Sequence, residues 1–122
     1  MMQLSKPQKL IHDMEKYVGG PIAVICGSML IDGKIASSTL TDTITEIFRL
    51  NDALRTRIVE KDGMVCQQVV PYEPCAIDVL QFDSETQLHS YAESCAKEPI
   101  PLSGKLCNIQ AVILPNRFGF VV

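Results

Sequence analysis

Arg55 is the residue whose type and position most clearly offer chemistry in this chain of 122 residues. It lies in the segment Asn51–Val70, NDALRTRIVEKDGMVCQQVV, between an expected helix and an expected hairpin. Near the C-terminus of a helix, a guanidinium stabilises the carbonyl end of the helix dipole. At a constrained joint, it can also bind a carboxylate through two parallel hydrogen bonds. Both roles of Arg55 stay open on spacing alone.

The remaining motifs do not predict catalysis. The segment Gly27–Lys34, GSMLIDGK, is similar to a phosphate-binding loop, but five residues rather than four separate its glycines, and Ile35 replaces the required hydroxyl. Cys26-Gly27-Ser28 is similar to the start of a papain-type nucleophile motif, but Met29 and Leu30 replace its second cysteine and its aromatic residue. We therefore expect no catalytic and no cofactor-binding residue in this chain.

The cysteines and histidines predict neither a disulfide framework nor a metal site. The five cysteines are an odd number at irregular spacings, and only two histidines accompany them. We expect reduced cysteines that act as small apolar side chains. His12 lies off the apolar stripe of its helix and His89 lies on a polar helix face, so both are expected in solvent. The cysteines are Cys26, Cys66, Cys75, Cys95 and Cys107.

Composition excludes two classes of partner. Eleven Lys and Arg face 14 Asp and Glu, for a net charge of -3, and they form no basic cluster that would bind nucleic acid or an anionic membrane. The longest apolar run, Ile22–Ile31, is about half as long as a bilayer span. Charged residues from Lys6 to Lys16 interrupt the stretch in which a secretory signal would be apolar. These observations predict a cytoplasmic protein.

The first elements follow from caps and periodicity. Ser5 and Gln8 form a capping box that starts a helix, which Gly19-Gly20-Pro21 ends. From Ile22 to Ile31 the residues on both faces of an expected strand are largely apolar, which predicts that the strand is covered on both sides. Gly27 would mark a bulge or a close backbone approach in this strand. Asp32-Gly33 then turns the chain. The expected apolar face of the helix consists of Leu10, Ile11, Met14, Tyr17 and Val18.

A second helix and a hairpin position Arg55. The helix is expected over residues 37–53, and its apolar face must pack on a sheet because four threonines weaken its intrinsic propensity. Asp62-Gly63 predicts the turn of a hairpin over Thr56–Val70, because a two-residue primed turn needs positive φ. The apolar face of this helix consists of Leu40, Ile44, Ile47, Phe48 and Leu54.

The last third of the chain predicts a strand over Ala76–Leu80, a helix that starts at a Ser84–Gln87 capping box, and two strands, Leu106–Leu114 and Phe118–Val122. The chain stops on Gly-Phe-Val-Val, in the middle of an expected buried strand. We expect that the reading frame continues and that the piece self-associates through the edge of this cut strand.

The order of these motifs resembles the condensation domains of nonribosomal peptide synthetases. Arg49–Ile58 resembles their second core motif, R-H-E-x-L-R-T-x-F: Arg49, Leu54, Arg55 and Thr56 match, whereas Asn51-Asp52 replaces His-Glu. Leu4–Gln8 is similar to their first motif, S-x-A-Q-x-x, with Pro7 in place of alanine. The resemblance spans the whole chain.

The resemblance implies an α/β fold of the chloramphenicol acetyltransferase type, a mixed sheet with helices packed on it in two layers. Residues 1–122 would be one N-terminal subdomain, cut before the catalytic H-H-x-x-x-D-G motif and inactive alone. Leu54, Arg55 and Thr56 would support the active site, and Arg55 would pair with the aspartate of that motif. The partners would be the C-terminal half of the domain and carrier proteins.

The implied reaction joins two substrates held as thioesters on phosphopantetheine. The acceptor amine attacks the donor thioester, an amide forms and the donor carrier is released. The second histidine of H-H-x-x-x-D-G would orient or deprotonate the amine, and no metal is implied. Alternatives are an epimerisation, cyclisation or CoA-dependent acyltransferase domain of the same superfamily, or a stand-alone interaction module.

Overall fold

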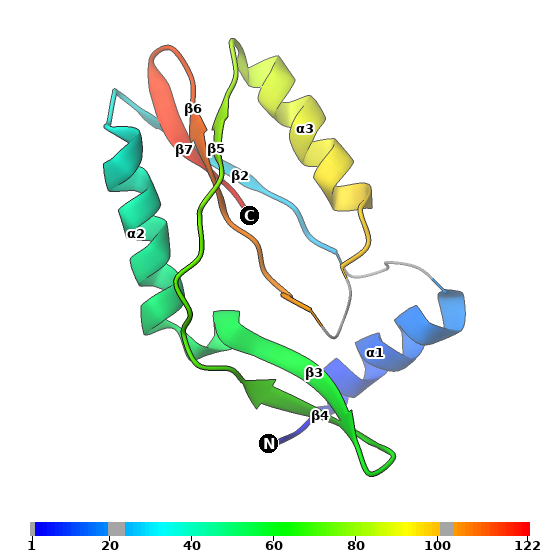
Figure 1. Ribbon diagram of the computed structural model, residues 1–122. Helices are drawn as coiled ribbons and strands as arrows, with labels where there is room; N and C mark the ends of the chain where they lie inside the picture. Colours follow the sequence, from blue (N-terminus) through cyan, green and yellow to red (C-terminus); the bar gives the residue numbers. More distant parts are fainter. Residues whose placement is uncertain (1, 20–23, 101–103) are drawn as a thin grey trace.

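The computed structural model describes residues 2–19, 24–100 and 104–122. Along the chain it contains three α-helices, one 3-10 helix and seven strands in these described residues (Figure 1). Their bounds, in chain order, are β1 Met2–Gln3, α1 Lys6–Val18, β2 Ser28–Asp32, α2 Ser37–Leu50, η1 Asp52–Arg55, β3 Thr56–Lys61, β4 Met64–Val69, β5 Val79–Gln81, α3 Glu85–Lys97, β6 Gln110–Ile113 and β7 Arg117–Val121.

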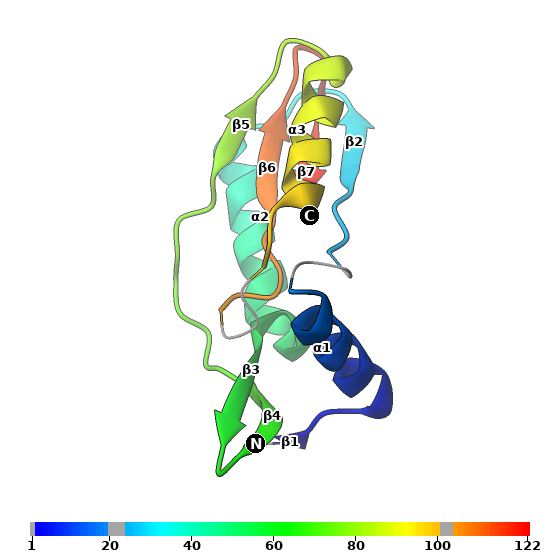
Figure 2. The same ribbon diagram turned by 90° about the vertical axis from the view of Figure 1, so that its right-hand side faces the viewer.

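The larger sheet is mixed and carries helices on both faces. Its strand order is β2-β7-β6-β5, in which β5 runs parallel to β6 and the other pairs are antiparallel. Ala111 packs with α2, whereas the next residue, Val112, packs with Leu88 of α3. Figure 2 shows α3 in front of the sheet and α2 behind it. The expected mixed sheet with packed helices is confirmed, but this part has three layers instead of two.

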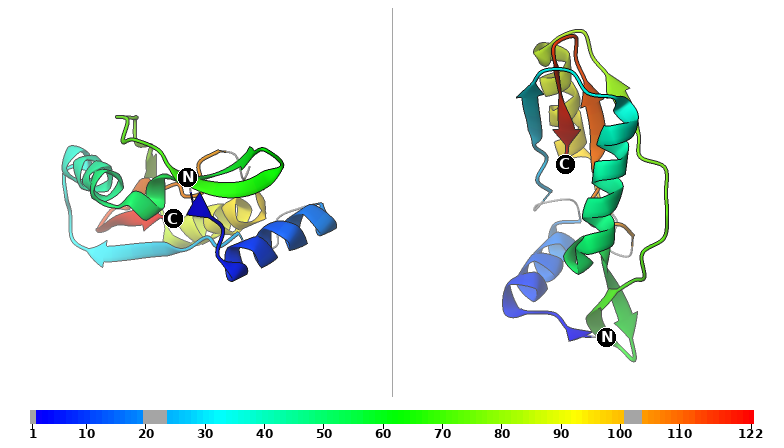
Figure 3. Two further views of the ribbon diagram at one scale, coloured as in Figure 1. Left: turned by 90° about the horizontal axis from the view of Figure 1, so that it is seen from below. Right: turned by 90° about the vertical axis from the view of Figure 1, so that its left-hand side faces the viewer.

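The smaller sheet lies at the other end of the molecule (Figure 3) and has the antiparallel order β1-β4-β3. The predicted hairpin is confirmed, and its turn has positive φ at both Asp62 (54°) and Gly63 (75°). A primed turn requires this conformation, because its twist matches that of the flanking strands. The turn therefore fixes the register in which β3 and β4 pair.

Helix α1 begins and ends as predicted but faces the other way. The Ser5 hydroxyl accepts from Gln8 N, the Gln8 side chain accepts from Ser5 N, and Gly19 ends the helix at φ 75°. The expected apolar face is turned to solvent, and Tyr17 is 92% exposed. The polar side packs instead, since Gln8 Nε2 donates to Gln67 Oε1 of β4 at 3.1 Å. The prediction of a solvated His12 is wrong, because its side chain is only 17% exposed.

The expected strand Ile22–Ile31 is shorter and more open than predicted. Strand β2 starts at Ser28, and residues 22 and 23 lie outside the described residues. Met29 is 55% exposed and Ile31 is 45% exposed, so this strand is not covered on both sides. Both lie on the α2 side of the sheet, opposite Phe120 and Phe118 in the register. Helix α2 packs nearer β6 and leaves this edge strand uncovered.

The close backbone approach occurs at a different glycine from the one expected. Gly27 has no other atom within 4 Å of an added Cβ, whereas a Cβ on Gly119 of β7 would lie 1.7 Å from Met29 O. Gly119 stands directly opposite Leu30 in the β2–β7 pair. Only a residue without a side chain permits this approach of the two strands.

The later elements are confirmed with shifted bounds. The short strand covers residues 79–81 rather than 76–80, and β6 starts at Gln110 rather than Leu106. Ser84 caps α3 through Gln87 N, but the Gln87 side chain accepts from Asp83 N instead of Ser84 N. His89 is exposed, as predicted. The sequence also predicts a break at Pro101 before the last two strands, and this residue lies outside the described residues.

Strand β7 cannot offer the free edge that we expected. It lies between β2 and β6 and forms backbone pairs with both along its length. Gly27 and Val122 extend the ladder, since each backbone N–H donates to the other's carbonyl oxygen at 2.9–3.0 Å. The prediction of self-association through this strand is therefore wrong, because the backbone hydrogen-bonding groups of β7 are already paired.

The molecule exposes more surface than a compact protein of its size. Its accessible area is 8227 Å² at 13.5 kDa, whereas a folded monomer of this mass exposes about 6,500 Å². Helix α1 and strand β2 expose large apolar side chains, among them Leu10, Met14, Tyr17, Met29 and Ile31. No helix of the described segments is long and apolar enough to cross a bilayer.

Candidate functional site

The joint between α2 and β3 is built by local capping. Helix α2 ends at Leu50 because Asn51 takes an extended conformation, with φ -121° and ψ 102°. The Asn51 side chain donates to Ile47 O at 2.7 Å and satisfies a carbonyl that the helix leaves unpaired. One turn of 3-10 helix, η1, then leads to Thr56, where β3 begins. Asn51 thus has a structural role in this chain.

Arg55 holds this joint together with all three of its side-chain nitrogens. Nε donates to Phe48 O of α2 at 3.1 Å, and Nη1 donates to Val70 O, just past the end of β4, at 2.8 Å. Nη2 forms an ion pair with Asp52. The Arg55 side chain is only 14% exposed. Arg55 therefore has both a bond to a carbonyl at the helix end and a carboxylate partner, but this carboxylate accepts from Nη2 and not through two parallel hydrogen bonds.

The predicted supporting residues Leu54, Arg55 and Thr56 lie together, as their adjacency requires. Leu54 packs against the core cluster that contains Leu40 and Ile44. Thr56 starts β3, where its backbone pairs with Val69 of β4. The carboxylate that binds Arg55 comes from Asp52 in the same turn, whereas the expected aspartate would belong to a motif that this sequence does not contain.

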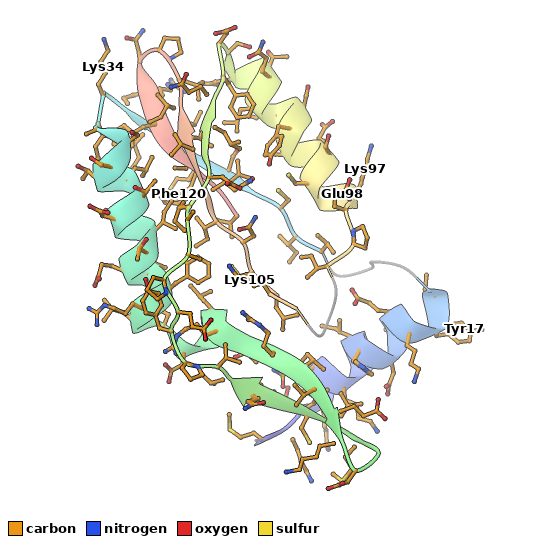
Figure 4. The ribbon with its side chains drawn as sticks, viewed as in Figure 1. Tyr17, Lys34, Lys97, Glu98, Lys105 and Phe120 are labelled. Carbon is orange, nitrogen blue, oxygen red and sulfur yellow. The ribbon has the colours of Figure 1, made fainter. Side chains whose placement is uncertain are left out.

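A cavity of about 370 Å³ opens beside this joint. Leu54, Arg55 and Arg57 line one side, the segment 70–75 lines another, and Lys105 completes it. We call it the basic cavity. Figure 4 shows Lys105 in the space between the larger sheet and the β3–β4 hairpin. The Lys105 ammonium donates to Cys75 Sγ at 3.4 Å. Sequence reasoning missed Arg57, Cys75 and Lys105, because only the tertiary fold brings these distant residues together.

The two histidines lie apart from this cavity. The His12 ring lies 3.3 Å from an Asp13 carboxylate oxygen on α1, and His89 is exposed on α3. In the described ranges, no group of three or more His, Cys, Asp or Glu side chains could hold a metal ion. The expectation of no catalytic residue in this chain is an absence that the structure does not test.

The five cysteines are free, and they differ in environment. Burial raises the pKa of the Cys26 thiol, and the neighbouring Cys95 raises it further. Burial also raises the pKa of the Cys107 thiol. Burial raises the pKa of the Tyr91 hydroxyl too, and this hydroxyl donates to Gln110 Oε1 at 2.6 Å. Cys75 is the exposed cysteine. Cys26 and Cys107 are thus partly buried and pack against the two core clusters as small apolar side chains.

Solved structures with the same fold are condensation domains of synthetases. The starter condensation domain of rhizomide synthetase, an H140V, R148A mutant in its own numbering, matches with a TM-score of 0.85 at 16% identity over 98% of this chain. The first condensation domain of the calcium-dependent antibiotic synthetase, in complex with a substrate analogue, matches with a TM-score of 0.82 at 15% identity, also over 98% of this chain. No curated protein sequence matches the chain.

The chain spans about a third of the length of these domains, 31% of the first and 32% of the second. At such identities, the likeness shows a shared fold. Membership of a family comes from the sequence itself, because the sequence model of the condensation domain family matches residues 1–114. The chain therefore belongs to the condensation domain family.

Proposed function

We propose that residues 1–122 form the N-terminal part of a condensation domain in a nonribosomal peptide synthetase. The whole domain would join an acceptor amine to a donor thioester and form an amide. The observation that carries this proposal is the Arg55 joint, which occurs at the L-R-T sequence within a chain whose fold matches condensation domains over 98% of its length.

Leu54, Arg55 and Thr56 would act as positioning residues in this domain. Arg55 fixes the exit of α2 to the base of the hairpin, and Leu54 anchors the same turn in the core. In the whole domain, the two guanidinium hydrogens that Arg55 has left would face the aspartate of H-H-x-x-x-D-G. The joint would then place the catalytic histidines relative to the sheet.

The remaining roles are proposals that follow from this one. The substrates would arrive on phosphopantetheine arms of carrier proteins, and the C-terminal half of the domain would supply the second wall of the active site. The chain alone would be inactive, because its two histidines lie on α1 and α3 rather than at the joint. A cytoplasmic location stays a prediction, which the five free cysteines support.

The first test is to read the gene beyond Val122. We expect the sequence H-H-x-x-x-D-G directly after this strand, and its absence would refute the proposal. The domain should then be expressed with both loaded carrier proteins and tested for a new amide by mass spectrometry. An acyl-CoA donor belongs in the same assay, because the starter domain of rhizomide synthetase has been solved in complex with C8-CoA.

The assay also distinguishes the related activities. Amide formation supports condensation, whereas inversion of a carrier-bound amino acid without a new amide would identify an epimerisation domain. Formation of a ring in the product would identify a cyclisation domain. Transfer of the acyl group from acyl-CoA to a free small-molecule amine or alcohol, with release of CoA and without any carrier protein, would identify a CoA-dependent acyltransferase.

A further inference from the structure

The basic cavity gathers cations in a protein whose net charge is negative. The chain has 11 Lys and Arg against 14 Asp and Glu, yet the cavity is lined by three cations, Arg55, Arg57 and Lys105, and by one carboxylate, Glu73. Asp52 already pairs with Arg55. Arg57 and Lys105 therefore outnumber the one carboxylate, Glu73, and the cavity is positively charged. This local charge is opposite in sign to the net charge of the chain.

Neither of these two cations has a carboxylate partner within the described part of the chain. Among the described residues, Arg57 bonds through Nη1 alone, which donates to Thr56 O at 3.0 Å. Within the same residues, Lys105 donates only to Cys75 Sγ, and a thiol sulfur is a weak acceptor. The Arg57 guanidinium and the Lys105 ammonium thus line the cavity from two separate segments. Arg57 belongs to β3, and Lys105 belongs to the segment before β6.

We propose that the basic cavity binds a phosphate group through Arg57 and Lys105. Arginine binds phosphate through two parallel hydrogen bonds, and lysine adds a point charge. A phosphate offers at least three acceptor oxygens, so one group can accept from both residues at once. The cavity of about 370 Å³ has room for the phosphate and for the chain that carries it. This site is distinct from the positioning role of Arg55 and does not require the acyl-transfer activity.

Cys75 provides a reporter inside the site. It lines the cavity, contacts Lys105, and is the exposed cysteine among the five. Its alkylation by iodoacetate and iodoacetamide can be followed by peptide mass mapping of the native 122-residue chain. The two reagents are similar in size, but only iodoacetate carries a negative charge. We expect the ratio of the iodoacetate rate to the iodoacetamide rate to fall about fivefold in Arg57→Gln.

Matched variants separate the site from general charge effects. Lys105→Gln should lower the same ratio, although it also removes the contact with Cys75. Arg57→Gln leaves that contact in place, so it gives the cleaner result. Lys97→Gln changes an exposed lysine at the end of α3 and should leave the ratio unchanged (Figure 4). Equal ratios in the unaltered chain and in Arg57→Gln would overturn the proposal.

Protection by ligands tests the phosphate directly. Inorganic phosphate should slow the alkylation of Cys75 by iodoacetamide saturably at constant ionic strength, and chloride should not. 4′-Phosphopantothenate, a phosphate ester without a thiol that would consume the reagent, should protect as well, whereas pantothenate without the phosphate should not. Stronger protection by 4′-phosphopantothenate than by phosphate would identify a phosphate ester as the ligand, and equal protection would identify free phosphate. Protection by pantothenate that equals protection by 4′-phosphopantothenate, or protection by none of the three, would refute a phosphate site.

Discussion

Arg55 and Val70 exchange two hydrogen bonds across the base of the β3–β4 hairpin. Val70 N donates to Arg55 O at 3.0 Å, and Arg55 Nη1 donates to Val70 O at 2.8 Å. The same guanidinium binds Phe48 O of α2. The Arg55 side chain therefore joins the end of α2 to the residue that follows β4, and the Arg55 backbone leads directly into β3. These contacts explain why an arginine stands at this joint.

Arg55→Ala should destabilise the chain by about 2–4 kcal/mol, because it leaves two part-buried carbonyl oxygens without their donor and Asp52 without its cation. Arg55→Lys should recover only part of this loss, because an ammonium lacks the planar fork that reaches Phe48 O and Val70 O together. Urea unfolding measures both variants. In the whole domain, Arg55→Ala should also lose amide formation.

Arg49→Ala is the control for this experiment. Arg49 forms an ion pair with Glu46 on the exposed side of α2. An exposed ion pair contributes little, so Arg49→Ala should cause no measurable loss of stability. If Arg55→Ala were as stable as Arg49→Ala and kept full activity in the whole domain, the guanidinium would have no positioning role.

Gly119→Ala should be among the most destabilising single substitutions in the larger sheet. The new Cβ would lie 1.7 Å from Met29 O, so β2 must move away from β7. Overpacking of this kind costs about 1–3 kcal/mol and occasionally more, and we expect the upper end. Gly27→Ala is the matched control in the neighbouring chain, because no other atom lies within 4 Å of the added Cβ. Thermal unfolding measures both, and equal midpoints would show that the two strands do not approach so closely.

Local residues allowed much of the fold to be predicted. Ser5 and Gln8 place the start of α1, and Asp62-Gly63 places the hairpin turn, because each signal acts within a few residues. The direction in which α1 turns its apolar face was not predictable, since periodicity reveals a face but not what covers it. The cavity was not predictable either, because Arg57, Cys75 and Lys105 meet only through long-range pairing.

The free energy of unfolding should fall as pH rises above about 8.5, the ordinary pKa of a cysteine thiol. The folded chain raises the pKa of Cys107 by burial, and it raises that of Cys26 by burial and by the neighbouring Cys95. Above the unfolded pKa the unfolded chain loses these protons first, so the free energy of unfolding decreases until pH passes the folded pKa. Urea unfolding between about pH 7.5 and pH 10, which lie on either side of the ordinary cysteine pKa, measures the slope.

Cys107→Ala should flatten this slope, because it removes one of the titrating thiols. Asn108→Ala is the control, since it changes an exposed side chain next to Cys107 and removes no thiol. A slope that is identical in all three proteins would show that the partly buried thiols do not link folding to pH.

The isolated chain should self-associate through the apolar face of α1 rather than through β7. That strand is paired on both sides, whereas Leu10 is 60% exposed, Tyr17 is 92% exposed and Val18 is 61% exposed. A contiguous apolar stripe on a helix favours association when nothing covers it. Leu10→Glu combined with Tyr17→Glu keeps helix formers on α1 and should shift the chain toward monomer in light scattering.

Met64→Glu is the control, at an exposed apolar residue beside the hairpin turn, and it should not shift the chain toward monomer. A chain that is monomeric at high concentration before any substitution would contradict this prediction, and an equal effect of Met64→Glu would move the association surface to the hairpin.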